Sequence, residues 1–187
     1  MSGFDYPVTK SAVMYKGLIV DVVHDTITLP NGKSALREVV RHADGAAVLP
    51  IDGDGNVVLV RQYRHPLGCM ALEIPAGMLG SGETHQECAA RELEEEVGFK
   101  PGNIRPLTKI SPSCGYCDEF IYIFLATDLV KTEQNLDEEE FIEVETYPIG
   151  EAVKMVFDGR IADAKTSIAI LAYSHKLYIG EEAGQKA

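Results

Sequence analysis

The sequence lacks the features that would place a protein in a membrane or on a nucleic acid. No apolar run approaches the roughly 18 residues of a membrane-spanning helix, and the first residues contain no signal-peptide hydrophobic segment. The formal net charge of −12 provides no positively charged footprint for nucleic acid or for an anionic membrane. We therefore expect neither kind of partner, and we expect any anionic substrate to be held by a metal and a few local arginines.

Cysteine is scarce, and the four residues do not form a disulfide framework (Cys69, Cys88, Cys114 and Cys117). With no secretion signal, we expect a cytoplasmic protein with reduced thiols. Cys114 and Cys117 form a C-x-x-C, which suits a redox pair or half of a zinc site. A second C-x-x-C and a Cys/His pair at zinc-finger spacing are both missing. No helix start is evident at this loop, where a thioredoxin-like site would need one. A redox function therefore remains a minor alternative.

The 187 residues are enough for one domain, or for one domain with a small extension. The N-terminal stretch is rich in β-branched residues, and Asn31-Gly32 is a strong hairpin signal. We expect an antiparallel β extension over residues 1–43, which cannot bury both of its faces alone. Residues 44–187 mix strands with a few helices, which indicates a layered α/β or α+β domain.

One predicted helix carries a dense set of carboxylates. Thr84 and Glu87 have capping-box spacing, so we expect the helix to start at Thr84 and to stop at Gly98. Glu92, Glu95 and Glu96 then share one face, where they repel one another. Oxygen ligands favour a hard cation, Mg²⁺ or Mn²⁺, which commonly bridges to a substrate phosphate. A solvated acidic face is the alternative for such a helix taken alone.

The residues around this helix follow a longer pattern. The pattern is Gly77, five residues, Glu83, seven residues, and then Arg91-Glu92-Leu93-Glu94-Glu95-Glu96-Val97-Gly98-Phe99. It covers 23 residues, with seven fixed identities and two apolar positions, and it resembles the Nudix box at every defined position. The resemblance implies hydrolysis of a nucleoside diphosphate linked to another moiety. It implies metal ligands at Glu92, Glu95, Glu96 and the Ala76 carbonyl. Arg91 would orient the box carboxylates, and Glu83 would support the metal site.

Three further segments resemble the ADP-ribose pyrophosphatase and nucleotide-sugar branch of the family: Arg61-Gln-Tyr-Arg64, Leu72-Glu-Ile-Pro-Ala-Gly77 and Asp163-Ala-Lys-Thr166. This likeness implies an α/β/α sandwich with a mixed sheet and the N-terminal β extension. It also implies a homodimer in which the N-terminal strands exchange and contribute to the partner's substrate site. Arg64 would contact the diphosphate. Our candidates for substrate contact are Arg61, Arg64, Glu73 and Glu140.

The loop 111–119 is expected to supply the catalytic base. Hydrolysis needs a water placed for in-line attack on phosphorus, and a nearby carboxylate can take its proton. The branch has a glutamate after a Ser-Pro-Gly-x-x-Asp-Glu-like loop, which corresponds here to Glu119. Asp118 and Glu140 are the alternatives, and Asp118 and Glu119 would otherwise be ordinary turn residues.

The same loop departs from the pattern of ADP-ribose-specific members, because Cys114 stands where they usually have proline. ADP-ribose, giving AMP and ribose 5-phosphate, is the first expectation for the substrate. GDP-mannose or a broad set of nucleotide sugars is the alternative. From another class of protein, a non-catalytic nucleotide-sugar sensor would retain the fold, although such sensors usually lose box glutamates.

Overall fold

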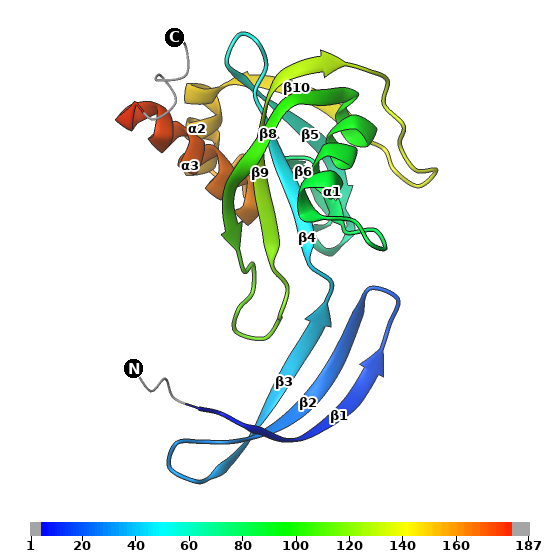
Figure 1. Cartoon of the computed structure of the whole chain (residues 1–187), viewed down its shortest axis with the longest axis vertical. Helices are drawn as coiled ribbons and strands as arrows, with labels where there is room; N and C mark the ends of the chain where they lie inside the picture. Colours follow the sequence, from blue (N-terminus) through cyan, green and yellow to red (C-terminus); the bar gives the residue numbers. More distant parts are fainter. Residues whose placement is uncertain (1–4, 181–187) are drawn as a thin grey trace. The chain divides into compact units, whose positions relative to one another are not determined.

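The structure is a computed structural model that describes residues 5–180 (Figure 1). The chain forms two compact units, and the division does not follow the sequence. One unit combines Met1–Asp44 with Ser111–Phe120, and the other combines Gly45–Ile110 with Ile121–Ala187. The loop that carries Asp118 and Glu119 therefore belongs to the same unit as the N-terminal strands.

The first unit contains a three-stranded antiparallel sheet in the order β1-β2-β3. Its strands are β1 (Val8–Lys16), β2 (Val20–Thr28) and β3 (Ser34–His42). The hairpin predicted at Asn31-Gly32 is confirmed, since Thr28 pairs with Ser34 and Gly32 takes the left-handed conformation, with φ of 79°. The expected antiparallel N-terminal extension is therefore present.

The loop 111–120 docks on the edge of β3 through its backbone. The Val40 N–H donates to the Tyr116 carbonyl at 2.7 Å, and the Asp118 N–H donates to the Val40 carbonyl at 3.2 Å. Cys117, between these two bonds, pairs with Val40 as a parallel bridge. Asp118 adds side-chain bonds, accepting from the Arg41 guanidinium at 2.9 Å and from the His42 N–H at 3.0 Å.

The second unit holds seven strands, three α-helices and two shorter helical turns within its described residues. The strands are β4 (Gly45–Pro50), β5 (Asn56–Arg64), β6 (Cys69–Glu73), β7 (Ala76–Met78), β8 (Phe99–Ile110), β9 (Ile121–Lys131) and β10 (Glu143–Pro148). The helical elements are η1 (His65–Leu67), α1 (His85–Glu92), η2 (Leu93–Val97), α2 (Ile149–Phe157) and α3 (Ala164–Ile179).

These strands form two sheets, β10-β5-β6 and β7-β4-β9-β8, and the second is mixed because β4 and β9 run parallel. Every residue of β4 is buried, and successive side chains enter different cores. Ala47 and Leu49 join the core that contains α2 and α3 residues, whereas Ala46 and Val48 join the core that contains α1 residues. Figure 1 shows α1 on one side of β4 and β9, with α2 and α3 on the other. The predicted α/β sandwich is confirmed.

The box helix begins and ends as expected, but its last turn is not α-helical. The Thr84 hydroxyl accepts from the Glu87 N–H, and the Glu87 carboxylate accepts from the Thr84 N–H, so the capping box is present. Gly98 closes the helix in the left-handed conformation, with φ of 74°. Between them, α1 gives way to the π-helical turn η2, which an α-helical pattern did not predict. Such wide turns often occur at functional sites.

Among the helices of residues 5–180, none combines the length and the apolar character that a membrane span requires.

Candidate active site

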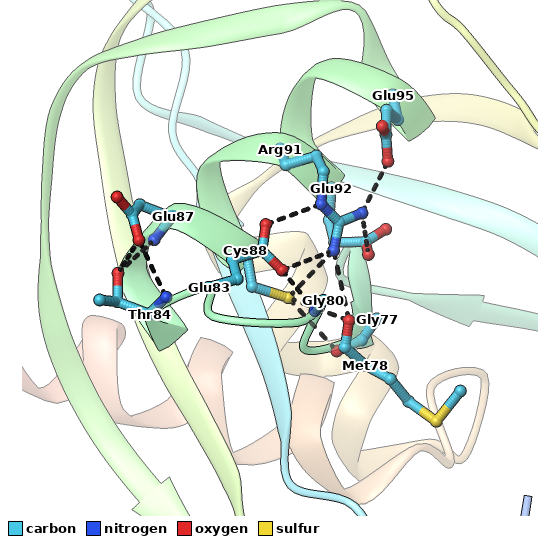
Figure 2. A network of polar contacts seen from close by, with 10 residues as sticks. All are labelled: Gly77, Met78, Gly80, Glu83, Thr84, Glu87, Cys88, Arg91, Glu92 and Glu95. Atoms are coloured by element: carbon cyan, nitrogen blue, oxygen red, sulfur yellow. Dashed lines mark hydrogen bonds and ion pairs between the residues drawn. The ribbon is translucent and has the colours of Figure 1, made fainter.

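Arg91 is the centre of the polar network at the box helix (Figure 2). Its Nε and Nη2 atoms donate to the two oxygens of Glu83 at 2.8 and 3.0 Å. Its Nη1 atom donates to Glu92 at 2.7 Å and to Glu95 at 2.8 Å. One guanidinium therefore neutralises part of the charge of three carboxylates, and these contacts raise the pKa of Arg91, with the Glu83 hydrogen bond as the largest cause.

Glu83 fastens the glycine-rich loop to the helix. One of its oxygens accepts from the Gly80 N–H at 2.8 Å, while the carboxylate as a whole pairs with Arg91. The Arg91 hydrogen bond, followed by that of Gly80, lowers the pKa of Glu83 to about 2. Glu83 is therefore a permanent anion that holds Arg91 in place.

Glu92 and Glu96 lie on the buried side of the helix, with 8% and 3% of their surface exposed. Burial is the main cause that raises the pKa of Glu92. Burial, followed by the charges of Glu92 and Glu140, raises the pKa of Glu96 to about 8. The Ala76 N–H donates to the Glu96 carboxylate, but within residues 5–180 the other oxygen, Oε2, is buried without a hydrogen-bond partner. The pair is thus a buried centre of negative charge.

The close approach of backbone and carboxylate at Gly77 also indicates a ligand site. A Cβ atom at this position would lie 1.9 Å from Oε1 of Glu92, so only glycine allows the carboxylate to lie against the strand. The donor set consists of carboxylate and carbonyl oxygens, which suits a hard divalent cation. Within residues 5–180, no three acidic, histidine or cysteine side chains are already gathered as a metal cluster. Glu95 is instead turned to Arg91 and its side chain is 34% exposed. Oxygens of Glu92, Glu96 and the Ala76–Gly77 backbone could hold such a cation, whereas Glu95 is paired with Arg91.

The segment after β9 closes the end of the π-helical turn. The Gln134 side chain donates to the Glu96 carbonyl at 2.6 Å, and the Asn135 N–H donates to the Glu95 carbonyl at 3.0 Å. These bonds satisfy two carbonyls that a helix end leaves open. Glu140, in the same segment, raises the pKa of both Glu92 and Glu96 by its charge. The structure thus brings this candidate close to the buried carboxylates.

A second polar network connects β5 and β6 with α3. Glu73 is 2% exposed, and it accepts a bidentate pair of hydrogen bonds from Arg64, from Nε at 2.7 Å and from Nη2 at 2.8 Å. Lys165 also donates to Glu73, and its Nζ lies 3.1 Å from Asp163. The four charges balance. Asp163 also caps α3 by accepting from the Thr166 N–H at 2.9 Å.

This network sets the direction of Arg64. Nε and Nη2 face Glu73, and among the charges acting on the guanidinium is that of Glu96. Burial alone would raise the pKa of Glu73, but the hydrogen bond from Arg64 and the charge of Lys165 outweigh it and lower that pKa to about 2. Glu73, a candidate for substrate contact, is buried and orients Arg64 through this pair of hydrogen bonds.

Arg61 lies on the opposite face of β5 from Arg64 and pairs with β10. Its guanidinium donates to both oxygens of Glu145, with Nη2 at 3.2 Å. The Tyr147 hydroxyl donates to the same carboxylate. Arg61 is about one third exposed, so this pair leaves part of the guanidinium open to solvent.

The candidate bases Asp118 and Glu119 lie in the unit of the N-terminal strands. Burial would raise the pKa of Asp118, but the hydrogen bonds from Arg41 and His42 lower it, which marks Asp118 as a structural anion of the loop. Glu119 lies 3.5 Å from Nδ1 of His42, and its side chain is 21% exposed. Of the two side chains, Glu119 makes fewer contacts with the residues of β3.

Sequence reasoning missed several contacts at these sites. The sequence predicts Asp163 as the cap of the last helix, which is confirmed, but it indicates no role for Lys165, Gln134 or Asn135. Glu73 and Lys165 are 92 positions apart, so no local spacing reveals their contact. The one available signal was Lys165, just after the start of α3, since a buried lysine is expected to have an acidic partner.

The chain belongs to the Nudix family. The family model described as the NUDIX domain matches residues 41–168, which include the whole box and both polar networks. The family resemblance read from the box is therefore confirmed.

Two relatives of known name cover most of the chain. The ADP-ribose pyrophosphatase of Bacillus subtilis (strain 168) is 38% identical over 159 residues, which is 84% of this chain and 86% of the relative. The GDP-mannose pyrophosphatase of Yersinia enterocolitica serotype O:8 / biotype 1B (strain NCTC 13174 / 8081) is 36% identical over 156 residues, 77% of this chain and 81% of the relative.

The fold also matches a solved structure, described as the crystal structure of ADP compounds hydrolase. The TM-score is 0.84, and the match covers 99% of this chain and 100% of the other. At 22% identity, this likeness supports the fold alone.

We predict that Glu73→Gln removes a stabilisation that depends on pH. The folded-state pKa of Glu73 lies below its unfolded value of 4.5, so its contribution is present above pH 4.5 and is lost as the pH falls towards 2. The difference in free energy of unfolding between wild type and Glu73→Gln should be on the order of 3 kcal/mol at neutral pH and should shrink through this window.

Urea unfolding at a series of pH values measures this difference. Glu139→Gln, at an exposed position of the 132–142 segment, is the matched control and should show a small difference at every pH. A Glu73→Gln difference that stayed constant from pH 7 to pH 2 would contradict the assigned charge network.

Proposed function

We propose that this protein is a metal-dependent pyrophosphohydrolase of nucleoside diphosphate sugars. The observation that carries the proposal is the buried pair Glu92 and Glu96 on an intact Nudix box, with Oε2 of Glu96 unsatisfied among the described residues. Two buried carboxylates repel each other and need a cation to remain ionised. The substrate class follows from the relatives, whose names refer to ADP-ribose and GDP-mannose.

The proposed metal is Mg²⁺, with Mn²⁺ as a substitute, because its ligands would be oxygens from Glu92, Glu95, Glu96 and the Ala76 carbonyl. When bound, such a cation polarises phosphoryl oxygens and offsets the charge that grows on them. Arg91 would keep Glu92 and Glu95 aligned while Glu83 fixes the guanidinium. The intact box argues against the sensor alternative.

The remaining steps are assigned to side chains outside the box. Glu73 orients Arg64 by accepting hydrogen bonds from its Nε and Nη2 atoms. The guanidinium N–H groups that do not face Glu73 would bind a phosphate oxygen. Arg61 and Glu140 are further candidates for substrate contact. Glu119 would accept the proton of the attacking water at a carboxylate oxygen, which makes the water a better nucleophile as it approaches phosphorus.

ADP-ribose is the proposed first substrate, with AMP and ribose 5-phosphate as products. GDP-mannose or a mixed set of nucleotide sugars is the second candidate, supported by the relative of that name and by Cys114 in the loop before Glu119. A cytoplasmic location belongs to the same proposal, and the four free cysteines suit a reducing compartment.

A homodimer completes the proposal. The sheet of residues 8–42 leaves large apolar side chains exposed, among them Val13 at 65%, Tyr15 at 58% and Leu36 at 56%. Exposed apolar surface of this kind is expected to be covered by a partner. We assign residues 1–43 to dimerisation and to the partner's substrate site, and residues 44–187 to the catalytic domain. A monomer by light scattering at micromolar concentration would contradict this part.

The direct test is phosphatase-coupled release of phosphate from a panel of ADP-ribose, GDP-mannose, other nucleotide sugars and nucleoside triphosphates. We expect turnover with Mg²⁺ or Mn²⁺ and none after EDTA, with ADP-ribose first. GDP-mannose in first place would support the second candidate, a GDP-mannose or broad nucleotide-sugar hydrolase. Binding of a nucleotide sugar without turnover under any of these conditions would support the sensor and overturn the enzyme proposal.

We expect Glu96→Gln to lower kcat by at least about 100-fold, because it removes a charged ligand from the metal site. The free energy of unfolding should stay level or rise, since the change removes a buried charge. Glu94→Gln is the matched control, because Glu94 lies in the same acidic run and pairs at the surface with Lys100. A Glu96→Gln enzyme with near-normal kcat would show that the metal ligands are wrongly assigned.

We expect Glu119→Gln to lower kcat by about 10²- to 10⁴-fold with little effect on metal affinity, as removal of a general base does. Asp118→Asn should instead lower stability, because Asp118 anchors the loop to Arg41 and His42. The pH–rate profile and the metal dependence of each variant make the comparison. If Glu140→Gln showed the larger loss of kcat, Glu140 would replace Glu119 as the base.

A further inference from the structure

The C-x-x-C of the 111–119 loop is folded into a single hydrogen-bonded turn. The Ser113 carbonyl accepts from the Tyr116 N–H at 3.1 Å and from the Cys117 N–H at 2.9 Å. Cys114 and Cys117 are therefore three positions apart on one turn. A disulfide spans a Cα separation of roughly 4.4–6.8 Å, and a single tight turn brings residues three positions apart to within about 7 Å.

The two thiols share one accessible place. Cys114 and Cys117 both line a cavity of about 160 Å³, together with Arg37 and Glu38 of β3. Cys114 is exposed and Cys117 is partly buried. A Cβ atom on Gly115, between them, would meet nothing within 4 Å. The space beside Gly115, between the two cysteines, is therefore open.

One end of the turn is fixed and the other is not. The backbone bonds of Val40 to Tyr116 and Asp118 lie on either side of Cys117 and hold it against β3. Cys114 lies at the solvent-facing end of the turn. This asymmetry suits an exposed attacking thiol beside an anchored second thiol.

The remaining cysteines have no such arrangement. Cys88 is buried in α1, and its thiol donates to the Met78 carbonyl at 3.5 Å. Cys69 is exposed on β6 but belongs to the other unit of the chain than Cys114 and Cys117. Substitution of Cys69 therefore removes the background oxidation of a second exposed thiol.

We propose that Cys114 and Cys117 form a dithiol site that exchanges with small-molecule disulfides and closes to an intramolecular disulfide. The Cys114 thiolate attacks one sulfur of the small disulfide and releases one small thiolate, leaving a mixed disulfide at Cys114. The Cys117 thiolate then attacks the Cys114 sulfur and releases the second small thiolate. Two protein thiols are oxidised, one small disulfide is reduced to two thiols, and the two protons pass to those thiols.

As the sequence indicates, no helix starts at this motif, so the proposed site does not depend on a helix N-terminus. The site is independent of the hydrolase proposal and requires neither metal nor nucleotide. Its closure would tie the ends of the turn that immediately precedes Asp118 and Glu119. The proposed disulfide is thus adjacent in sequence to Glu119, the candidate base.

The test uses the full chain, reduced, with Cys69→Ser as the background. The protein is incubated with roughly 0.1 mM oxidised glutathione, quenched in acid and measured by intact mass. We expect loss of the mass of two hydrogen atoms, with closed product exceeding mixed disulfide about tenfold or more, because neighbouring thiols have millimolar or higher effective concentration. Addition of Cys117→Ser should instead leave one stable glutathionyl group on Cys114.

The matched variant Cys114→Ser should react at least about tenfold more slowly, since Cys117 is partly buried. Where Cys117→Ser lowers expression, Cys117→Ala serves in its place, and urea unfolding checks that each variant is folded. Accumulation of a glutathionyl adduct without closure in the Cys69→Ser background would overturn the proposal. Loss of two hydrogen atoms that persisted in Cys114→Ser would overturn it as well.

Discussion

The arrangement of the box depends on one cation, the guanidinium of Arg91. The box carboxylates would repel one another, and Arg91 donates to three of them at 2.7–3.0 Å: Glu83 of the glycine-rich loop, and Glu92 and Glu95 of the helix. The glycine-rich loop is held through Glu83, and the helix face is held through Glu92. Because one group performs both tasks, the strand, the loop and the helix keep their mutual positions even though the site itself is negatively charged.

The two charge networks of the catalytic domain differ in balance. Arg64, Glu73, Lys165 and Asp163 form a neutral set, and the low pKa of Glu73 shows that its anion is favoured even under burial. At Glu96 the balance is negative, and burial raises the pKa instead. A neutral set stabilises the connection between sheet and helix, whereas an unbalanced, negatively charged set could hold a cation. The two networks therefore differ in their net charge and not in the types of residue that form them.

Local signals in the sequence predicted local structure well. The capping box at Thr84, the stop at Gly98 and the hairpin at Asn31-Gly32 each depend on residues a few positions apart, and all three are present. The π-helical turn was not predictable, because it depends on tertiary partners for its open carbonyls. Lys165 and the docking of the 111–120 loop on β3 were also missed, since contacts across tens of residues leave no periodic trace in one sequence.

The unit built from Met1–Asp44 and Ser111–Phe120 is discontinuous in the chain, and this has a consequence during synthesis. Strands β1, β2 and β3 leave the ribosome first, but the loop that pairs with Val40 follows only after residues 45–110 have been translated. At about 5–20 residues per second, the edge of β3 waits several seconds for its partner. During that interval the nascent sheet has an open edge, and chaperones or a neighbouring nascent chain have time to occupy it.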